Sequence, residues 1–240
     1  TSVIKVVLFN ENFKIKFKLS TKNVVIKNSQ GKSEINMNSF WTITSQLIKN
    51  IMKISKIEKG NIISIGITGN MVGVWPVNNN GVPVRNAILW NDTRSKQIFK
   101  NIEKKNPKIY QKIFHLSGSI VQFGCTIPVI KWLDKYEKKT IQKTKYFLTC
   151  KDWLRFNLTN NFYNDHTERA VAPGNIFKAE HSLAIFKLLD LNKKIIEKFP
   201  KVKQSHEIGG YVTNSASKLI GVKEGTPVII GAGDVPSSAI

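Results

Sequence analysis

The segment "GTPVIIGAGDVPSS", Gly225 to Ser238, joins an apolar run, a glycine turn and an acid within a few residues. A continuous apolar run such as "PVIIG" is typical of a strand buried on both faces of a sheet. The two glycines after it let the backbone approach a ligand closely. Asp234 comes next, and Pro236 suits the first turn of a helix. The segment therefore predicts a strand, a turn and a helix, with a carboxylate where turn and helix meet.

Asp234 has two interpretations at this place. Aspartate is among the best helix-capping residues, and the local pattern alone favours a cap. In open α/β sheets, however, ligands bind at the carboxyl ends of the strands. Two further turns follow apolar runs, "TGNMVG" after "IISIGI" and "LWNDTR" after "AI". We expect all three turns to open into one cleft.

The remaining pattern predicts a mixed α/β sheet with helices on its faces, formed by residues 1–240 as a single domain. Strands are expected in three runs before residue 29, in a buried run at 61–70, and in "VGVWPV" and "AILW". The pair Asn80-Gly81 suits a hairpin turn with positive φ. Apolar spacings of three and four predict a helix from Ser39 to about Ile57. Asn91 or Asp92 is expected to cap the helix after "NDTR", and 120–212 is predicted to be mostly helical.

Composition narrows the class of protein. No apolar run approaches the roughly 18–20 residues that cross a bilayer, so we predict a soluble protein without a membrane partner. Cys125 and Cys150 fit reduced thiols in the cytoplasm. The four histidines show no paired metal-binding spacing, so no structural metal is predicted.

The net charge of +21 raises the hypothesis of a nucleic-acid partner. Only four of the 37 basic residues are arginine, although arginine is the better reader of phosphate and guanine. The lysines are spread along the chain rather than gathered into a stripe. Runs such as "KNIEKKNPK" therefore indicate solvated helix faces. We predict no specific nucleic-acid partner and keep nucleic-acid binding as the weaker alternative.

Several segments together resemble the N-terminal domain of the FGGY carbohydrate kinases, the family of xylulokinase, gluconokinase and glycerol kinase. They are "TSVIKVVLFNE", "SIGITGNMVGVWPVNNNGVPVRNAILWNDTR", "KDWLRFNLTNNFYNDHTERA" and "GTPVIIGAGD", and the resemblance spans essentially all 240 residues. It implies an actin-like, ribonuclease-H-like domain that holds a sugar, facing a second domain that holds adenosine. The implied reaction transfers the γ-phosphoryl group of ATP, with Mg²⁺, to a hydroxyl of a sugar or polyol.

The resemblance also implies roles for particular residues. Asp234 matches the catalytic base. Asn70, Met71 and Val72 match the lining of the sugar pocket, and Trp90 its apolar wall. Asp92 is a further candidate for binding the sugar, although a helix cap would look the same in sequence. The end of the family's first phosphate loop, which binds the cofactor ATP, is matched by Thr1 and Ser2.

Two departures from the family pattern leave alternatives open. The phosphate-loop aspartate and the family's C-terminal nucleotide-binding domain have no counterpart in the sequence, so we expect a domain truncated at both ends. A catalytically degenerate actin-like sensor of sugar or nucleotide is the alternative function. Val72 stands where xylulokinase-like members carry histidine, which makes xylulose doubtful and leaves a polyol, another pentulose or a shorter sugar open. A homodimer is also left open.

Overall fold

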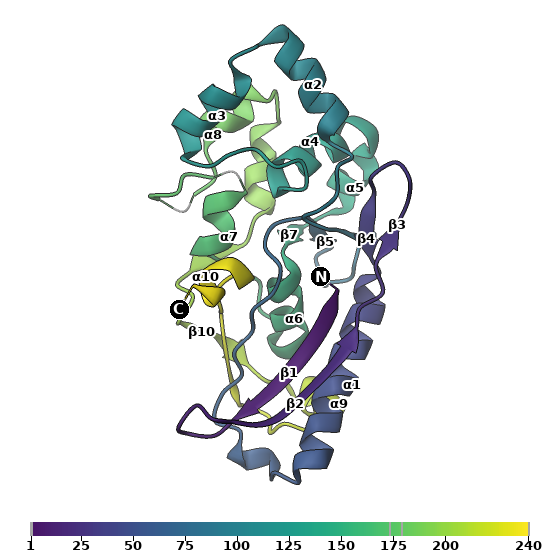
Figure 1. The fold of residues 1–240 in the computed structure, drawn as a ribbon, viewed down its shortest axis with the longest axis vertical. Coiled ribbons are helices and arrows are strands. Elements are labelled where there is room, and N and C mark those ends of the chain that lie inside the picture. The colour runs from purple at the N-terminus through teal and green to yellow at the C-terminus, as the bar shows by residue number, and fades with distance from the viewer. Residues whose placement is uncertain (1, 173, 179, 240) are drawn as a thin grey trace.

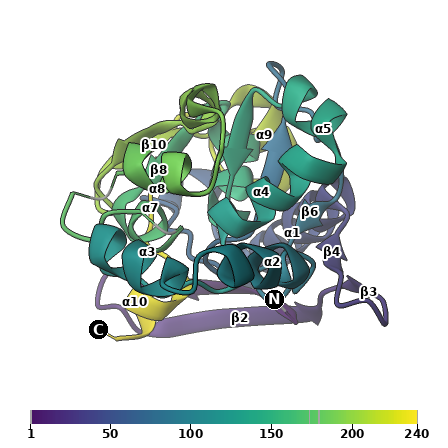
Figure 2. The ribbon, with the colours of Figure 1, turned by 90° about the horizontal axis from the view of Figure 1, so that it is seen from above.

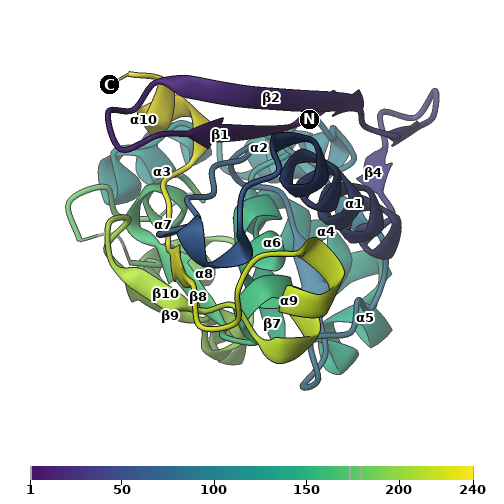
Figure 3. The ribbon, with the colours of Figure 1, turned by 90° about the horizontal axis from the view of Figure 1, so that it is seen from below.

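The computed structural model describes residues 2–172, 174–178 and 180–239, with a helical upper half above a lower half that carries the first strands (Figure 1). Thr1 therefore lies outside the described residues. The strands β1 (Val3–Phe9) and β2 (Ile15–Lys22) pair as an antiparallel hairpin. Figures 2 and 3 show that this hairpin forms one outer face of the molecule. β3 (Ile26–Lys27), β4 (Ser33–Ile35) and β6 (Ala87–Ile88) form a second sheet, in the order β3-β4-β6.

Helix α1 (Met37–Ser55) packs against both strands of the hairpin. The Asn36 side chain caps it by accepting from the Ser39 N–H at 2.9 Å. Its apolar side chains Met37 and Phe40 join a core that contains Ile4 from the hairpin. The three early strand runs and the amphipathic helix predicted from periodicity are thus confirmed.

The buried strand predicted at 61–70 is not found. This segment is extended, but it makes only two isolated parallel bridges, Ile65 with Val228 and Gly69 with Gly233. In both bridges the partner residue belongs to β11 (Pro227–Ile229) or to the turn after it. The segment therefore pairs along one edge. Among the described residues no strand pairs with its other edge. The segment is therefore only partly buried, and the Ile63 side chain is 78% exposed.

The hairpin predicted around Asn80-Gly81 is present. It follows β5 (Trp75–Val77), which pairs with β7 (Tyr146–Leu148), and the Asn78 N–H bonds to the Val82 carbonyl at 2.9 Å. Of the predicted pair only Gly81 has a positive φ, +73°, so the expectation for Asn80 was wrong. Asn80 instead donates its N–H to the Asn78 side chain.

The middle of the chain is richer in helices than in strands, as predicted for 120–212, although turns and loops make up much of that segment. It contains α2 (Lys96–Lys105), α3 (Ile109–Ser117), α4 (Thr126–Tyr136), α5 (Lys138–Lys143), α6 (Cys150–Thr159), α7 (His166–Val171) and α8 (Leu183–Leu188), with the short strands β8 (Tyr163–Asp165) and β9 (Lys201–Lys203). The chain ends with β10 (Ile208–Tyr211), α9 (Asn214–Ile220), β11 and α10 (Asp234–Ser238). Among the described residues, none of the helices has both the length and the apolar character to span a bilayer.

The predicted cap of α2 is wrong. The N-cap is Ser95, which makes no side-chain cap bond, and neither Asn91 nor Asp92 reaches the helix end. The carboxylate of Asp92 turns instead to the backbone N–H of Ser33, 59 residues earlier in the chain. A long-range partner has therefore displaced the local capping role.

Candidate functional site

The two glycine-containing turns, "TGNMVG" and "GAGD", lie side by side. Gly233 pairs with Gly69 in a parallel bridge, and the Asp234 N–H donates to the Gly69 carbonyl at 3.0 Å. Gly231, at the end of the strand, has φ +75°, and a Cβ there would lie 1.8 Å from the Ile67 carbonyl oxygen. Only glycine fits such a close approach of two backbones. The "GAGD" turn is thus fixed directly against "TGNMVG".

Asp234 is the first residue of α10, and its side chain is exposed. The N-cap of this helix is Gly233, so the strict capping interpretation of Asp234 is wrong. One carboxylate oxygen accepts from the adjacent Val235 N–H at 3.0 Å. The structure therefore presents an acid to solvent at the end of a strand, on the first turn of a short helix.

The "NMV" turn contacts the residue before Asp234. A Cβ placed on Gly233 would lie 2.2 Å from Met71 Cγ, so Met71 rests on the residue before Asp234. Asn70 is buried, and its Nδ2 has no hydrogen-bond partner within the described chain. A buried donor without a partner costs free energy unless a ligand or water accepts from it. The contact of Asn70 with a sugar stays a prediction.

Val72 has an unfavourable backbone conformation. Its φ is +55°, which is an outlier for a β-branched residue and costs on the order of 1–3 kcal/mol. Its N–H donates to Glu168 Oε2 at 2.7 Å. The carboxyl group of a residue far along the chain thus holds the turn in this shape. Sequence reasoning missed Glu168, since nothing in "HTERA" distinguishes it from a solvated acid.

The third turn adjoins the second through a pair of backbone hydrogen bonds. Val74 and Ile88 each donate an N–H to the other's carbonyl, at 2.8 and 2.9 Å. Trp90 follows β6 and is 44% exposed. A Cβ on Gly124 would lie 1.7 Å from the Trp90 carbonyl oxygen, so the start of α4 packs against this turn. The three turns are thus linked in space by backbone contacts.

Asp92 is buried in an ion-pair network. Its two carboxylate oxygens accept from the Ser33 N–H at 2.7 Å and from the backbone and guanidinium of Arg94 at 2.8 to 2.9 Å. Arg94 also pairs with Glu34 at 2.6 Å and stacks on Trp132. Asp92 therefore fixes the "LWNDTR" turn from within. A direct contact of Asp92 with a sugar stays a prediction.

Ser2 is the one described residue of the expected phosphate loop. It is exposed at the start of β1, and its carbonyl accepts from the Asn23 N–H at 2.9 Å. Ser2 is thus open to solvent, and no other described residue was assigned to the nucleotide. The cofactor role of Thr1 and Ser2 stays a prediction.

A buried network of charges, which sequence reasoning also missed, lies behind the turns. Lys151 Nζ pairs with Asp152 at 3.1 Å and with Asp165 at 2.7 Å, and Arg155 pairs with Asp152 at 2.9 Å. These four side chains are completely buried in the described structure. The signal in the sequence was the run of charges in "KDWLR", placed on a helix whose Trp153 and Leu158 are buried.

The charges in this network control one another's protonation. Burial alone would raise the pKa of Asp152, but the charges of Lys151 and Arg155 and hydrogen bonds from Asn164 and Thr149 outweigh it. They hold the pKa of that carboxyl well below its usual range. Asp152 is therefore a permanent buried anion, matched by the two cations beside it.

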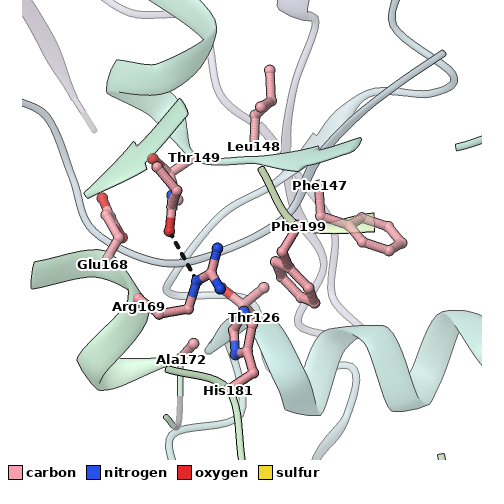
Figure 4. Close-up of a pocket in the computed structure, with 10 residues that line it drawn as sticks. Thr126, Phe147, Leu148, Thr149, Glu168, Arg169, Ala172, His181 and Phe199 are labelled. Atoms are coloured by element: carbon pink, nitrogen blue, oxygen red, sulfur yellow. Dashed lines mark hydrogen bonds between the residues drawn. The ribbon is translucent and has the colours of Figure 1, made fainter. Parts of the chain in front are cut away.

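Glu168 has the opposite character. Burial, added to the nearby charges of Asp152 and Asp165, outweighs Lys151 and raises its pKa from 4.5 to about 8. Figure 4 shows Glu168 and Arg169 projecting from α7 at a small cavity of about 10 Å³, which has room for one water molecule. Neither this cavity nor the surface hollow of about 490 Å³ beside Arg169 and Glu197 is lined by Asp234 or Trp90. No residue of the three turns lines either space, although Glu168 and Thr126, which line the small cavity, bond to Val72 and Gly73.

Replacement of Glu168 by glutamine is expected to change the pH dependence of stability. The folded protein keeps the Glu168 proton up to about pH 8, whereas the unfolded chain releases it near 4.5, so the wild-type free energy of unfolding falls as pH rises between these values. Glu168→Gln removes this slope, and its stability relative to wild type should rise by roughly 1.4 kcal/mol per pH unit in that window. Urea unfolding at pH 5, 6, 7 and 8 measures it.

The exposed Glu224 provides the matched control, because Glu224→Gln removes a carboxylate that lies at the surface. Its stability difference from wild type should vary with pH far less than that of Glu168→Gln. A difference for Glu168→Gln that is equally flat would show that Glu168 is ionised in the folded protein.

Comparisons with known proteins show what the sequence is similar to. The family model described as "FGGY family of carbohydrate kinases, N-terminal domain" matches residues 1–240. A probable L-xylulose kinase of Haemophilus influenzae is 27% identical over 99% of this chain and 48% of its own length. The xylulose kinase of Bacillus subtilis is 29% identical over 100% of this chain and 47% of its own length. The chain thus spans about half the length of the curated relatives it matches.

Solved structures share the fold. The ligand-bound xylulose kinase from Lactobacillus acidophilus superposes with a TM-score of 0.86 at 22% identity, over 98% of this chain and 46% of that one. The glycerol kinase from Plasmodium falciparum, solved with ADP, gives a TM-score of 0.84 at 22% identity, over 99% of this chain and 47% of that one. The actin-like α/β fold expected from the sequence is confirmed.

Proposed function

The chain belongs to the FGGY family of carbohydrate kinases, and we propose that it forms the sugar-binding part of an enzyme that phosphorylates a sugar or polyol with ATP. The observation that carries the proposal is the place of Asp234. Its carboxylate is exposed on the first turn of α10, and the residue before it contacts Met71 and pairs with Gly69. An acid held on a regular element that is fixed to its neighbour can orient a hydroxyl better than an acid on a mobile loop.

In this proposal Asp234 is the general base. Phosphoryl transfer needs little covalent chemistry from the protein, so a carboxylate that orients the attacking hydroxyl and accepts its proton supplies much of what is needed. Mg-ATP would supply the phosphoryl group, and its Mg²⁺ would neutralise part of the phosphate charge. The exposed hydroxyl of Ser2 fits a phosphate contact, and the remaining nucleotide contacts would come from residues outside this chain.

The sugar would lie on the "NMV" turn. The unpartnered Nδ2 of Asn70 would donate to a sugar hydroxyl, and Met71 and Trp90 would cover its carbons. Val72 offers no donor to a sugar, because its side chain is apolar and its backbone N–H is already bonded to Glu168. The site would therefore read fewer hydroxyls than one with histidine at this position.

The proposal also includes a location in the cytoplasm and sets aside the sensor alternative. The buried free thiols of Cys125 and Cys150 fit the reducing cytoplasm. The relatives and solved structures cited above are all named as kinases, which does not favour the degenerate sensor. The absence of a specific nucleic-acid partner stays a prediction.

The function is tested by a coupled assay of ADP release with the full-length protein. Xylulose and L-xylulose, named for relatives, come first, followed by gluconate and glycerol, named for structural neighbours. We expect one of these compounds to raise ADP release well above the sugar-free rate. Binding of a sugar by calorimetry without any sugar-dependent ADP release would contradict the kinase and favour the sensor.

A further inference from the structure

We propose that α7 sets the geometry of the candidate site, with Thr167 and Glu168 as positioning residues that each hold one of its turns. Glu168 bonds to the "NMV" turn, and Thr167 bonds to the "GAGD" turn. The inference rests on the proposed function, because it assigns to α7 the spacing between the sugar-binding turn and the base. Figure 1 shows α10 directly beneath α7.

The bond from Glu168 fixes the "NMV" turn. Its Oε2 accepts the Val72 N–H at 2.7 Å, and the two residues are 96 positions apart in the chain. The side chain is buried, and Oε1 has no partner among the described residues. Val72 adopts a positive φ that a valine avoids when free. A turn with this conformation keeps its shape only while the surroundings hold it, and this hydrogen bond comes from outside the turn.

The bond from Thr167 fixes the "GAGD" turn. Thr167 Oγ1 accepts from the Gly233 N–H at 3.0 Å, and Gly233 directly precedes Asp234. The single hydroxyl proton is donated to Asp165 Oδ2 at 2.6 Å. Since Asp165 is held by Lys151, the hydroxyl has a fixed orientation and presents its lone pairs to Gly233. Thr167 therefore links the buried charge network to Gly233, the residue before the candidate base.

The two bonds come from adjacent residues of one helix. The turns that they hold are also joined directly, through the backbone at Gly69 and Gly233, through Met71, and through Thr68 Oγ1, which donates to the Ala232 carbonyl at 3.0 Å. α7 adds to these contacts a tie that comes from outside both turns. A misplacement of about 1 Å at a reacting centre can lower a rate by about 10²-fold, so loss of this tie should be visible in catalysis.

Hydrogen exchange tests the positioning without any assay of activity. In the full-length protein, Glu168→Ala should speed exchange in peptides covering 69–74 and leave 231–235 unchanged, and Thr167→Val should do the reverse. The expected increase is about 5- to 10-fold, which corresponds to loss of one hydrogen bond. Glu168→Gln and Thr167→Ser keep the acceptors and should restore slow exchange. Thr44→Val, which deletes another buried hydroxyl within α1, is the matched control and should change neither region.

Kinetics then test the consequence for the reaction. Glu168→Ala should mainly raise KM for the sugar, by about tenfold, whereas Thr167→Val should mainly lower kcat, by about 10- to 100-fold. Thr44→Val should change neither constant.

The exchange experiment can fail separately from the activity assay, so this inference and the proposed function are tested independently. If the wild-type protein phosphorylates no sugar, the function is wrong, and the crossed exchange pattern still decides the role of α7. If both variants speed exchange equally in both regions, or match Thr44→Val, α7 has only a general structural role and the inference is overturned.

Discussion

Asp234→Asn in the full-length protein is expected to lower kcat for sugar phosphorylation by about 10²- to 10⁴-fold, the range typical for loss of a general base. Asparagine keeps an oxygen that can accept from the Val235 N–H, so the start of α10 should remain intact. Sugar binding should persist, because the "NMV" turn does not depend on the Asp234 carboxylate for any described contact. The coupled ADP assay measures the rate, and calorimetry measures the binding.

The control for this variant is Asp134→Asn on α4, an acid that belongs to none of the three turns. It should leave kcat and sugar affinity near their wild-type values. Near-normal turnover of Asp234→Asn would mean that Asp234 only complements the positive end of α10, as an acid in the first turn of a helix does.

Lys151→Met should produce the largest loss of stability, about 3–5 kcal/mol, because removal of one partner from a buried ion pair leaves an uncompensated charge. Asp152 and Asp165 both pair with Lys151, and all three side chains are fully buried. Arg155 would still neutralise Asp152, but no other described cation pairs with Asp165. Urea unfolding of the full-length protein at pH 7 measures the change.

Lys203→Met is the control, since Lys203 is partly exposed and lies 3.9 Å from Glu207. Ion pairs of this kind contribute at most about 1 kcal/mol. If Lys151→Met destabilised the protein no more than Lys203→Met, the buried network would not hold the core as described.

The sequence allowed prediction wherever the structure depends on local spacing. The apolar spacing in 39–57 follows the pitch of a helix, so α1 could be placed within a few residues of its ends. Gly81 and the turn "GAGD" could be identified because glycine is favoured where φ is positive or two backbones approach closely. These features need only neighbours in the chain.

Features that depend on distant partners could not be predicted from the residues alone. Asp92 stands where a cap would stand, yet its partners are Ser33 and a buried Arg94. Thr167 and Glu168 lie in a segment without a catalytic pattern, and their contacts to Gly233 and Val72 cross 66 and 96 residues. Only the fold brings these groups together, so the support behind the site was missed, whereas Asp234 could be named as a candidate from its own segment.

The most direct test of the central claim is a crystal structure of the full-length protein with its sugar bound. We predict one sugar hydroxyl at about 2.6–3.2 Å from a carboxylate oxygen of Asp234, the distance a general base requires, with another hydroxyl accepting from Asn70 Nδ2. A sugar bound away from the "NMV" turn, with Asp234 facing only solvent, would contradict the assignment of this chain as the sugar-binding part of a kinase.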